Sequence, residues 1–424
     1  MISASKIYYC SILLIASLNA HEQYYINTMA QYVAMPSSVK NCLYRFASNN
    51  SKIKKMNKKF SYYDRPIFRF FPALCSLAHC DIADLPTPIY RLSSLEKRMN
   101  SYAMLYLKDD GLSGKCLHNS IRYFGGNKIR KLEFLLGDAL SKGARSVMTY
   151  GCIGSNHAVA TAVCAKIFGL RCITMLTPQP INKIVKRNLY LMYQNDADII
   201  ISPNHEIRNI QTICSYIQNK YEYNSMPYFI PTGGSCPIGV IGFVNAAFEL
   251  KEQIAQGRIP EPDYIYVSTG SCGTLAGLLL GVRAAQLKTK VIGIAIEPNN
   301  KLVSNCVSLI QKTNRLLHDI DNTFPLFSWG EEEMYIEDCF TGSGYGIETD
   351  EGIQAMQLLS ETENIDLDPT YTAKAFAGLL NKVESRHHNQ DIILFWHTFC
   401  GNMNVNEQEI DMNLPQWLQQ LFFL

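Results

Sequence analysis

The chain has 424 residues, of which 47% are hydrophobic and 18% are charged, a balance typical of a folded globular protein with two or three domains. Its formal net charge is +2, from 39 basic and 37 acidic residues, and no long basic stripe is present. Binding to a polyanion such as nucleic acid is therefore not expected.

The N-terminus has the outline of a signal peptide. Lys6 precedes an apolar run at residues 7–18, which is too short to span a bilayer, so no membrane span is predicted. The alternative is an upstream start codon or a packing extension, with Met29 or Met35 as the true start. A basic stretch at residues 52–59 is interpreted as a solvated loop.

Fourteen cysteines are spread along the chain without a CxxC pair. A zinc site usually needs two close pairs of ligands, so no metal site is predicted. We expect reduced thiols that pack as small hydrophobic side chains. Free thiols favour a reducing compartment, and the expected location is the cytoplasm.

From about residue 85, short apolar runs alternate with longer helical segments. This alternation is typical of parallel sheets with helices on both faces, in which ligands bind beyond the carboxyl ends of the strands. The predicted strands are 146–150, 171–176, 198–202, 264–268, 291–297 and 392–397, and two of the predicted helices are 158–168 and 274–286.

Three loops after or between these elements have unusual compositions. The segment STGSCGTLAG, residues 268–277, places glycines before an apolar helix, which suits an anion because glycine permits close backbone approach and the helix end offers unpaired N–H groups. A phosphate site is predicted at Gly270, Ser271, Cys272, Gly273 and Thr274. A plain tight turn is the structural alternative.

The second loop is GCIGSNH, residues 151–157, between a predicted strand and an alanine-rich helix. Ser155 and Asn156 either cap that helix or face the cleft. The third is GGNKIRK, residues 125–131, where Lys128 begins a helix after a Gly-Gly-Asn turn. Such a lysine is usually a surface charge, but partial burial there would depress its pKa, as a Schiff-base lysine requires.

Together these motifs resemble the pyridoxal-phosphate (PLP) enzymes of the tryptophan-synthase-β fold, fold type II, in particular the D-cysteine desulfhydrase and aminocyclopropane-carboxylate deaminase branch. The resemblance covers residues 85–402. It rests on several segments in the family's order: LPTPIYRLSSLE, YLKDDGLSG, GGNKIRKLEFLLGDAL, GCIGSNHAVATA, PTGGSCPIGVIGF, STGSCGTLAG, GSGYGIETDEG, DPTYTAKAFAGLL and ILFWHTFCG.

The resemblance implies roles for individual residues. Lys128 matches the Schiff-base lysine, and Lys131 matches a lysine that holds the phosphate. Asn156 matches the partner of the ring hydroxyl, Ser155 the residue beside the substrate carboxylate, and Thr398 the partner of the pyridine nitrogen. The remaining matches are the phosphate loop at residues 270–274 and the two active-site tyrosines, Tyr345 and Tyr371.

Substrate choice in this branch depends on two positions. The deaminases carry Glu and Leu where this chain has Thr372 and Thr398, which resembles the desulfhydrases. Two further departures are Gly154 for the family's Gln, which would widen the substrate pocket, and Phe399 in the altered HTFCG segment, which would place bulk near the ring. The loop Gly-Tyr-Gly-Ile-Glu, residues 344–348, also lacks the family's proline.

The resemblance predicts two α/β units with PLP in the cleft between them. The boundaries are an N-terminal extension at 1–84 that packs outside, a large PLP-binding domain at 85–131 and 233–424, and a smaller inserted domain at 132–232. The expected activity is α,β-elimination on a small amino acid, most simply D-cysteine to pyruvate, ammonia and hydrogen sulfide. The competing hypotheses are an aminocyclopropane-carboxylate deaminase, a serine or threonine dehydratase, and a non-catalytic PLP-binding relative. The resemblance also suggests a homodimer.

Overall fold

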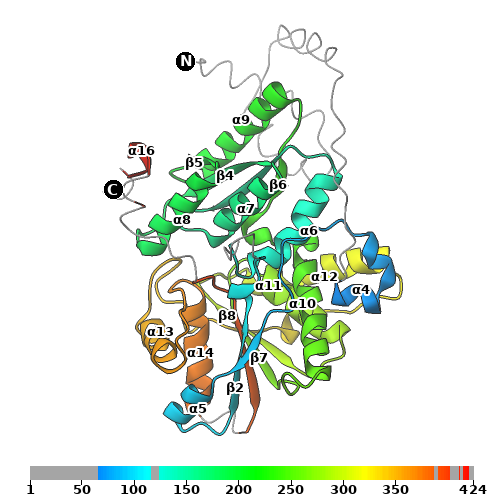
Figure 1. The fold of residues 1–424 in the computed structure, drawn as a ribbon, viewed down its shortest axis with the longest axis vertical. Helices are drawn as coiled ribbons and strands as arrows, with labels where there is room; N and C mark the ends of the chain where they lie inside the picture. Colours follow the sequence, from blue (N-terminus) through cyan, green and yellow to red (C-terminus); the bar gives the residue numbers. More distant parts are fainter. Residues whose placement is uncertain (1–64, 116–123, 386–389, 402–409, 411–413, 420–424) are drawn as a thin grey trace.

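The computed structural model describes residues 65–115, 124–385, 390–401, 410 and 414–419. The signal-like run and the basic stretch lie outside these residues. The described part has two open sheets, with helices packed around each (Figure 1). None of its helices combines the length and apolarity needed to cross a membrane.

The larger sheet has six strands, and Figure 1 shows it in the lower half of the molecule. Strand β1 is antiparallel to β2, and the remaining neighbouring pairs of this sheet are parallel. In spatial order the strands are β1 (Ile89–Arg91), β2 (Met104–Asp109), β10 (Ile392–His397), β7 (Tyr264–Thr269), β8 (Lys290–Ala295) and β9 (Tyr335–Glu337).

The smaller sheet is entirely parallel and is formed by one continuous stretch of the chain. In spatial order its strands are β5 (Asp198–Ile201), β4 (Arg171–Thr177), β3 (Ser146–Cys152) and β6 (Tyr228–Ile230). These strands lie within the predicted inserted segment 132–232, although the boundaries of that domain stay a prediction.

Helices cover both faces of the larger sheet because its central strands are apolar on both sides. Along β7, Ile265 and Val267 join one core cluster, whereas Tyr266 joins the cluster on the other face. This period of two is the pleat of a buried strand. The first cluster includes α10 (Pro237–Ala255), α11 (Gly273–Ala284) and α12 (Leu302–Ile320), and the other includes α5 (Ser93–Met99), α13 (Asp350–Glu363) and α14 (Thr372–Glu384).

The smaller sheet packs with α6 (Lys128–Ser141), α7 (Asn156–Ile167) and α8 (Lys183–Gln194), and α9 (His205–Tyr223) lies beside it in Figure 1. Helix α6 also packs against α10 of the larger unit. The first turn of α6 therefore lies where the two units meet.

The six predicted strands are all present, with ends shifted by up to two residues. Four strands were not predicted: β1, β2, β6 and β9. Three of these, β1, β6 and β9, have only three residues each, too few for an alternating pattern to stand out. The antiparallel β1 also departs from the expected all-parallel pairing.

The described end of the N-terminal extension does not pack outside the fold. Ile67 and Leu74, from α4 (Pro66–Phe70) and the 3-10 helix η4 (Pro72–Ser76), are fully buried in the core cluster of the larger sheet. Arg65 forms a buried ion pair with Glu133 of α6. At the other terminus, Leu418 of α16 (Gln416–Gln419) is buried in the cluster of the smaller sheet, although the predicted boundaries place it with the large domain.

Candidate active site

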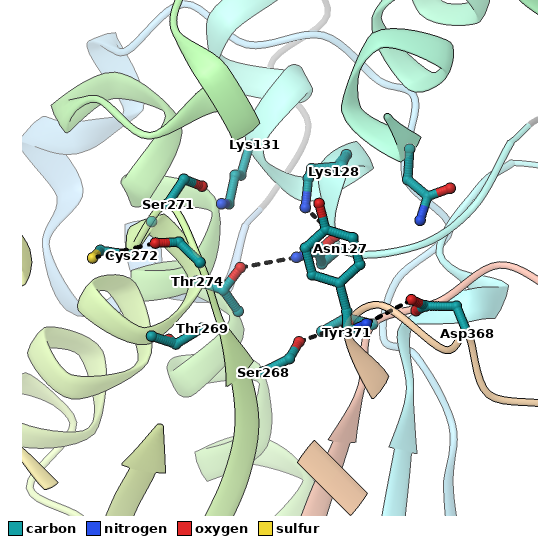
Figure 2. Close-up of a pocket in the computed structure, with 14 residues that line it drawn as sticks. Asn127, Lys128, Lys131, Ser268, Thr269, Ser271, Cys272, Thr274, Asp368 and Tyr371 are labelled. Carbon is teal, nitrogen blue, oxygen red and sulfur yellow. Dashed lines mark hydrogen bonds between the residues drawn. The ribbon is translucent and has the colours of Figure 1, made fainter. Parts of the chain in front are cut away.

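A cavity lies where the carboxyl ends of β7 and β10 meet the first turns of α6 and α11 (Figure 2). Its empty volume, open solvent included, is about 440 Å³. It is lined by Asn127, Lys128, Lys131, Asn156, Ser268, Thr269, Gly270, Ser271, Cys272, Gly273, Thr274, Asp368, Tyr371 and Thr398.

A glycine turn places Lys128 in this cavity. Gly126 has φ +89°, and a Cβ there would lie 2.9 Å from the carbonyl oxygen of Thr398, so both conformation and space require glycine. The Asn127 N–H donates to that same carbonyl at 3.1 Å. The turn is therefore attached to the end of β10, and α6 begins at Lys128.

The amine of Lys128 is suited to nucleophilic chemistry. Its Nζ donates to Asn127 Oδ1 at 2.8 Å and lies 5.9 Å from the centre of the Tyr371 ring. Burial lowers the pKa of Lys128 to about 8, and the negative charge of Asp368 opposes that decrease. Roughly a tenth of such amines are neutral at pH 7, compared with fewer than about one in a thousand for an ordinary lysine.

Lys131 lies one turn further along α6, and Figure 2 shows both amines directed into the cavity. Its Nζ donates to the carbonyl oxygen of Gly233 at 3.1 Å. Burial, reinforced by the neighbouring Lys128, lowers the pKa of Lys131 well below its ordinary value. An anion bound beside these two lysines would favour their protonated forms, so the pair is suited to anion binding.

The predicted phosphate loop forms the facing wall. Cys272 has φ +65° and precedes the first residue of α11, Gly273. A Cβ at Gly273 would lie 2.5 Å from Ser235 Oγ and 2.8 Å from Lys131 Nζ, so a side chain here would displace these two polar groups from the loop. The N–H groups of Ser271 and Cys272 make no hydrogen bond to a described residue. The loop thus combines a helix N-terminus, free donors and a lysine.

Ser155 and Asn156 differ in their placement. Asn156 lines the cavity, and its Oδ1 accepts a hydrogen bond from Asn188 Nδ2 at 2.9 Å. Ser155 caps α7, since its Oγ accepts from the N–H of Ala158 at 3.2 Å, and it does not line the cavity. The predicted catalytic role of Ser155 therefore stays a prediction.

The two predicted tyrosines form a pair. Their hydroxyl oxygens are 2.7 Å apart, and their rings pack edge to face with centres separated by 5.9 Å. Tyr371 lines the cavity, whereas Tyr345 is outside the lining and contacts Tyr371. Burial raises the pKa of both hydroxyls, so both are protonated at neutral pH. The loop before Tyr345 is held by Lys374, whose amine donates to the carbonyl oxygens of Thr341 and Gly344.

Several lining residues were missed by the sequence analysis, namely Asn127, Ser268, Thr269 and Asp368. Asp368 is a buried carboxylate whose pKa is raised by burial, although the N–H of Tyr371 donates to it at 2.7 Å. Asn127 Nδ2 donates to Thr274 Oγ1 at 2.9 Å and so connects α6 to the phosphate loop. The motifs containing these residues were recognised, but nothing local distinguishes them from ordinary turn residues.

The two positions expected to set substrate choice are not equivalent. Thr398 lines the cavity, and its Oγ1 lies 3.4 Å from Ser268 Oγ. Thr372 is fully buried outside the lining, where its hydroxyl donates to Asp368 Oδ2 at 3.1 Å. Any effect of Thr372 on the substrate therefore acts through Asp368.

Two departures from the family's sequence pattern lie close to the site. Phe399 follows the lining residue Thr398 but does not line the cavity itself, and its ring lies 5.4 Å from the guanidinium of Arg187. The predicted effect of its bulk near the ring stays a prediction. Gly154 does not widen the pocket, because the side-chain amide of Gln179 occupies the adjacent space and accepts from the Gly154 N–H at 3.1 Å.

Comparison with known proteins identifies the family. Residues 82–398 match the family model described as "Pyridoxal-phosphate dependent enzyme". The chain belongs to this family. It is 31% identical to D-cysteine desulfhydrase of Serratia proteamaculans over 338 residues, which cover 77% of this chain and 94% of the relative. D-cysteine desulfhydrase of Salmonella choleraesuis is also 31% identical, over 326 residues that cover 75% of this chain and 92% of the relative.

Solved structures agree with this assignment. A crystal structure of an ACC deaminase homologue matches with TM-score 0.68 and 30% identity, over 85% of this chain and 99% of the other. A PLP-dependent aspartate racemase matches with TM-score 0.50 and 15% identity, over 77% of this chain and 93% of the other, which shows the fold alone. The predicted fold type and cofactor dependence are confirmed.

The cavity fits the cofactor of this family. PLP carries an aldehyde that reacts with a neutral amine and a phosphate that needs cationic and N–H donors. Lys128 is the buried amine with a lowered pKa, and the cradle at Gly273 beside Lys131 leaves space that a Cβ would fill. The buried hydroxyl of Thr269, which makes no hydrogen bond to a described residue, adds a polar group to the same wall.

Proposed function

We propose that this enzyme catalyses α,β-elimination on D-cysteine, giving pyruvate, ammonia and hydrogen sulfide with consumption of one water. The observation that carries the proposal is the half-buried Lys128, whose amine has a pKa near 8 and lines the same cavity as the glycine loop at residues 270–274. Relatives described as D-cysteine desulfhydrase match over more than nine-tenths of their length and support the choice of substrate.

PLP, when bound, supplies the electron sink that makes the α-proton of an amino acid acidic. Lys128 would hold the cofactor covalently, while Lys131 and the loop 270–274 would bind its phosphate. Asn156 would bind the ring hydroxyl and Thr398 the pyridine nitrogen. A threonine hydroxyl does not stabilise a protonated pyridine as a carboxylate would, which favours prompt loss of a β-substituent over transamination.

The chain's own residues would move one proton and stabilise the leaving group. The amine of Lys128 is neutral often enough near pH 8 to remove the α-proton as a general base. The Tyr345–Tyr371 pair keeps its protons at neutral pH and would donate a hydrogen bond to the sulfur, which departs as hydrosulfide. Tyr371 lies beside Lys128, so the base and the hydrogen-bond donor are close together.

Ring opening of aminocyclopropane-carboxylate is the second candidate, favoured by the structural match to an ACC deaminase homologue. Ring opening has no leaving group and needs acid–base help at the far carbon. Thr372, held by Asp368, cannot supply that help at neutral pH. A serine or threonine dehydratase would differ in the β-substituent that leaves, and a non-catalytic PLP-binding protein would hold the cofactor without turnover.

A substrate panel tests the proposal. Purified protein would be given D-cysteine, L-cysteine, aminocyclopropane-carboxylate, serine and threonine, while sulfide, pyruvate and 2-oxobutyrate are measured. We expect D-cysteine to react fastest, with equal amounts of sulfide and pyruvate. Faster ring opening would favour the deaminase. A cofactor trapped by borohydride on Lys128 without turnover of any substrate would favour the non-catalytic protein.

Two further inferences accompany this function. We infer that the enzyme acts in a reducing compartment, the cytoplasm, because the cysteines of the described residues are free thiols and two of them, Cys75 and Cys339, are exposed. A homodimer is expected from the family resemblance, and gel filtration with light scattering measures it directly.

A further inference from the structure

Gln179 does not line the cavity itself but lies between two loops beside it. One loop runs from Gly154 into the lining residue Asn156, and the other carries Tyr345, which is hydrogen-bonded to the lining residue Tyr371.

Gln179 follows β4, and its Oε1 accepts from the Gly154 N–H in the loop that carries Ser155. Its Nε2 would lie 2.8 Å from a Cβ on Gly154 and 3.4 Å from a Cβ on Gly346, next to Tyr345. Both neighbouring positions are glycines, so the amide has the space that their side chains would fill.

The orientation of this amide follows from its partner. The Gly154 N–H is a donor, so the amide oxygen faces it, and the NH₂ group lies beside the Cβ positions of Gly154 and Gly346. That NH₂ group makes no hydrogen bond to a described residue. It therefore offers two donors in the gap between the Ser155 loop and the Tyr345 loop.

The chain around Gln179 is built to hold that position. Pro178 and Pro180 restrict the backbone on both sides. Further along the same segment, Asn188 donates through Nδ2 to the Gly154 carbonyl at 2.7 Å and to Asn156 Oδ1 at 2.9 Å. Both polar groups of Gly154 are thus bound by one segment, which couples Gln179 to Asn156 in the cavity.

We propose that Gln179 is a specificity-determining residue whose side-chain NH₂ group binds the α-carboxylate of the amino-acid substrate, a donor that glycine at position 154 cannot provide. The inference rests on the proposed function in assigning an amino acid as substrate. An amide donor to a carboxylate makes a charge-assisted hydrogen bond, which is stronger than a neutral one.

The isosteric change Gln179→Glu separates this role from a structural one. The carboxylate still accepts from Gly154, so the loop keeps its hydrogen bond, but the donor becomes a negatively charged acceptor. We expect KM for D-cysteine to rise about 10- to 100-fold, as loss of a charge-assisted hydrogen bond implies, with kcat within a few-fold and PLP content unchanged. Gln194→Glu makes the same charge change at an exposed position and should leave KM unaltered.

A binding measurement tests the donor without turnover. D-Alanine has no β-leaving group, and its Kd, measured by titration of the cofactor absorbance, should weaken in Gln179→Glu by the same factor as KM. Ethylamine, which lacks a carboxylate, should keep its affinity. Gln179→Met, which keeps bulk without polar atoms, provides the comparison if the Glu variant loses its fold, and should also weaken D-alanine.

The proposal is overturned if Gln179→Glu binds D-alanine as the wild type does, or if ethylamine loses affinity equally. Failure of the proposed reaction is a separate result, because wild-type enzyme that releases no sulfide from D-cysteine would still bind D-alanine. If the wild type binds D-alanine and Gln179→Glu binds it more weakly, the result supports the role of Gln179 in carboxylate binding. That conclusion does not depend on which leaving group the enzyme releases.

Discussion

Helix α6 carries three cationic side chains in its first turn, and they meet opposite surroundings. Arg130 points into the larger unit, where it donates to both carboxylate oxygens of Asp110 and to Glu249. Lys128 and Lys131 point into the cavity, where they donate to an amide oxygen and a backbone carbonyl respectively. Of these three cations, Arg130 is in ion pairs, whereas Lys128 and Lys131 form no ion pair with a described residue.

The pKa values follow this difference. Burial opposes the charge of Arg130, but Asp110 and Glu249 outweigh it and raise the pKa of the guanidinium. Burial also raises the pKa of Glu249, yet Arg130 and Lys108 dominate and hold it at about 2. Both cavity lysines have lowered pKa values instead. A buried charge that is paired within the protein has a structural role. A buried amine without an ion-pair partner is instead a candidate for binding a ligand.

The largest effect is expected at Lys128. Lys128→Ala removes both the attachment point of PLP and the proposed base, so turnover of D-cysteine should fall by about 10³-fold or more. The free energy of unfolding of the cofactor-free protein should change by less than about 1 kcal/mol. Borohydride reduction followed by peptide mapping should no longer label this peptide. Labelling of another lysine in the wild type would contradict the assignment.

At Arg130, two positions after Lys128 on the same helix, we expect a substitution to reduce stability. Arg130→Met leaves Asp110 and Glu249 buried without their cation, so the free energy of unfolding should fall by about 3–5 kcal/mol. Denaturant unfolding of the cofactor-free protein measures it. Arg145→Met, at an exposed arginine, is the matched control and should stay within about 0.5 kcal/mol of wild type. Equal stability of the two variants would mean that the buried network is not structural.

At the adjacent residue, Lys131→Met should weaken PLP binding without reducing stability. The cofactor-free protein should be as stable as wild type or more so, because an uncompensated buried amine is removed. Its PLP Kd should rise about 10- to 100-fold through loss of a charge-assisted contact to phosphate. Lys142→Met, at the exposed end of α6, should leave Kd unchanged. A drop in stability as large as that of Arg130→Met would contradict the distinction between the two surroundings.

The smallest effect concerns pH. Attachment of PLP needs the neutral amine, so its rate in the cofactor-free protein should rise with pH and level off above about 8, the pKa of Lys128. Asp368 raises that pKa, so Asp368→Asn should move the midpoint to lower pH. Stopped-flow absorbance at a series of pH values measures both. A midpoint that moved upward would show that Asp368 does not act on the amine through its charge.

Local sequence pointed to Lys128 and to the glycine loop at residues 270–274, and the structure brings both to the same cavity. A glycine turn before a helix has a recognisable composition, and its chemistry depends on residues within a few positions, as at Lys128 and Gly273. The central strands were also predictable, because strands buried on both faces are apolar without interruption. The resemblance then joined these segments into one family.

Tertiary structure decided how distant residues meet. Asp368 and Gln179 lie in ordinary loops, and only the packing of the two units brings the first beside Lys128 and the second between Gly154 and Gly346. Residues 65–76 looked like an extension, yet Ile67 and Leu74 complete a core formed mainly by residues from position 240 onward. The compensation of Arg130 likewise depends on Glu249, 119 residues distant. Turn composition acts within a few residues, whereas burial and charge compensation depend on contacts that the sequence alone does not specify.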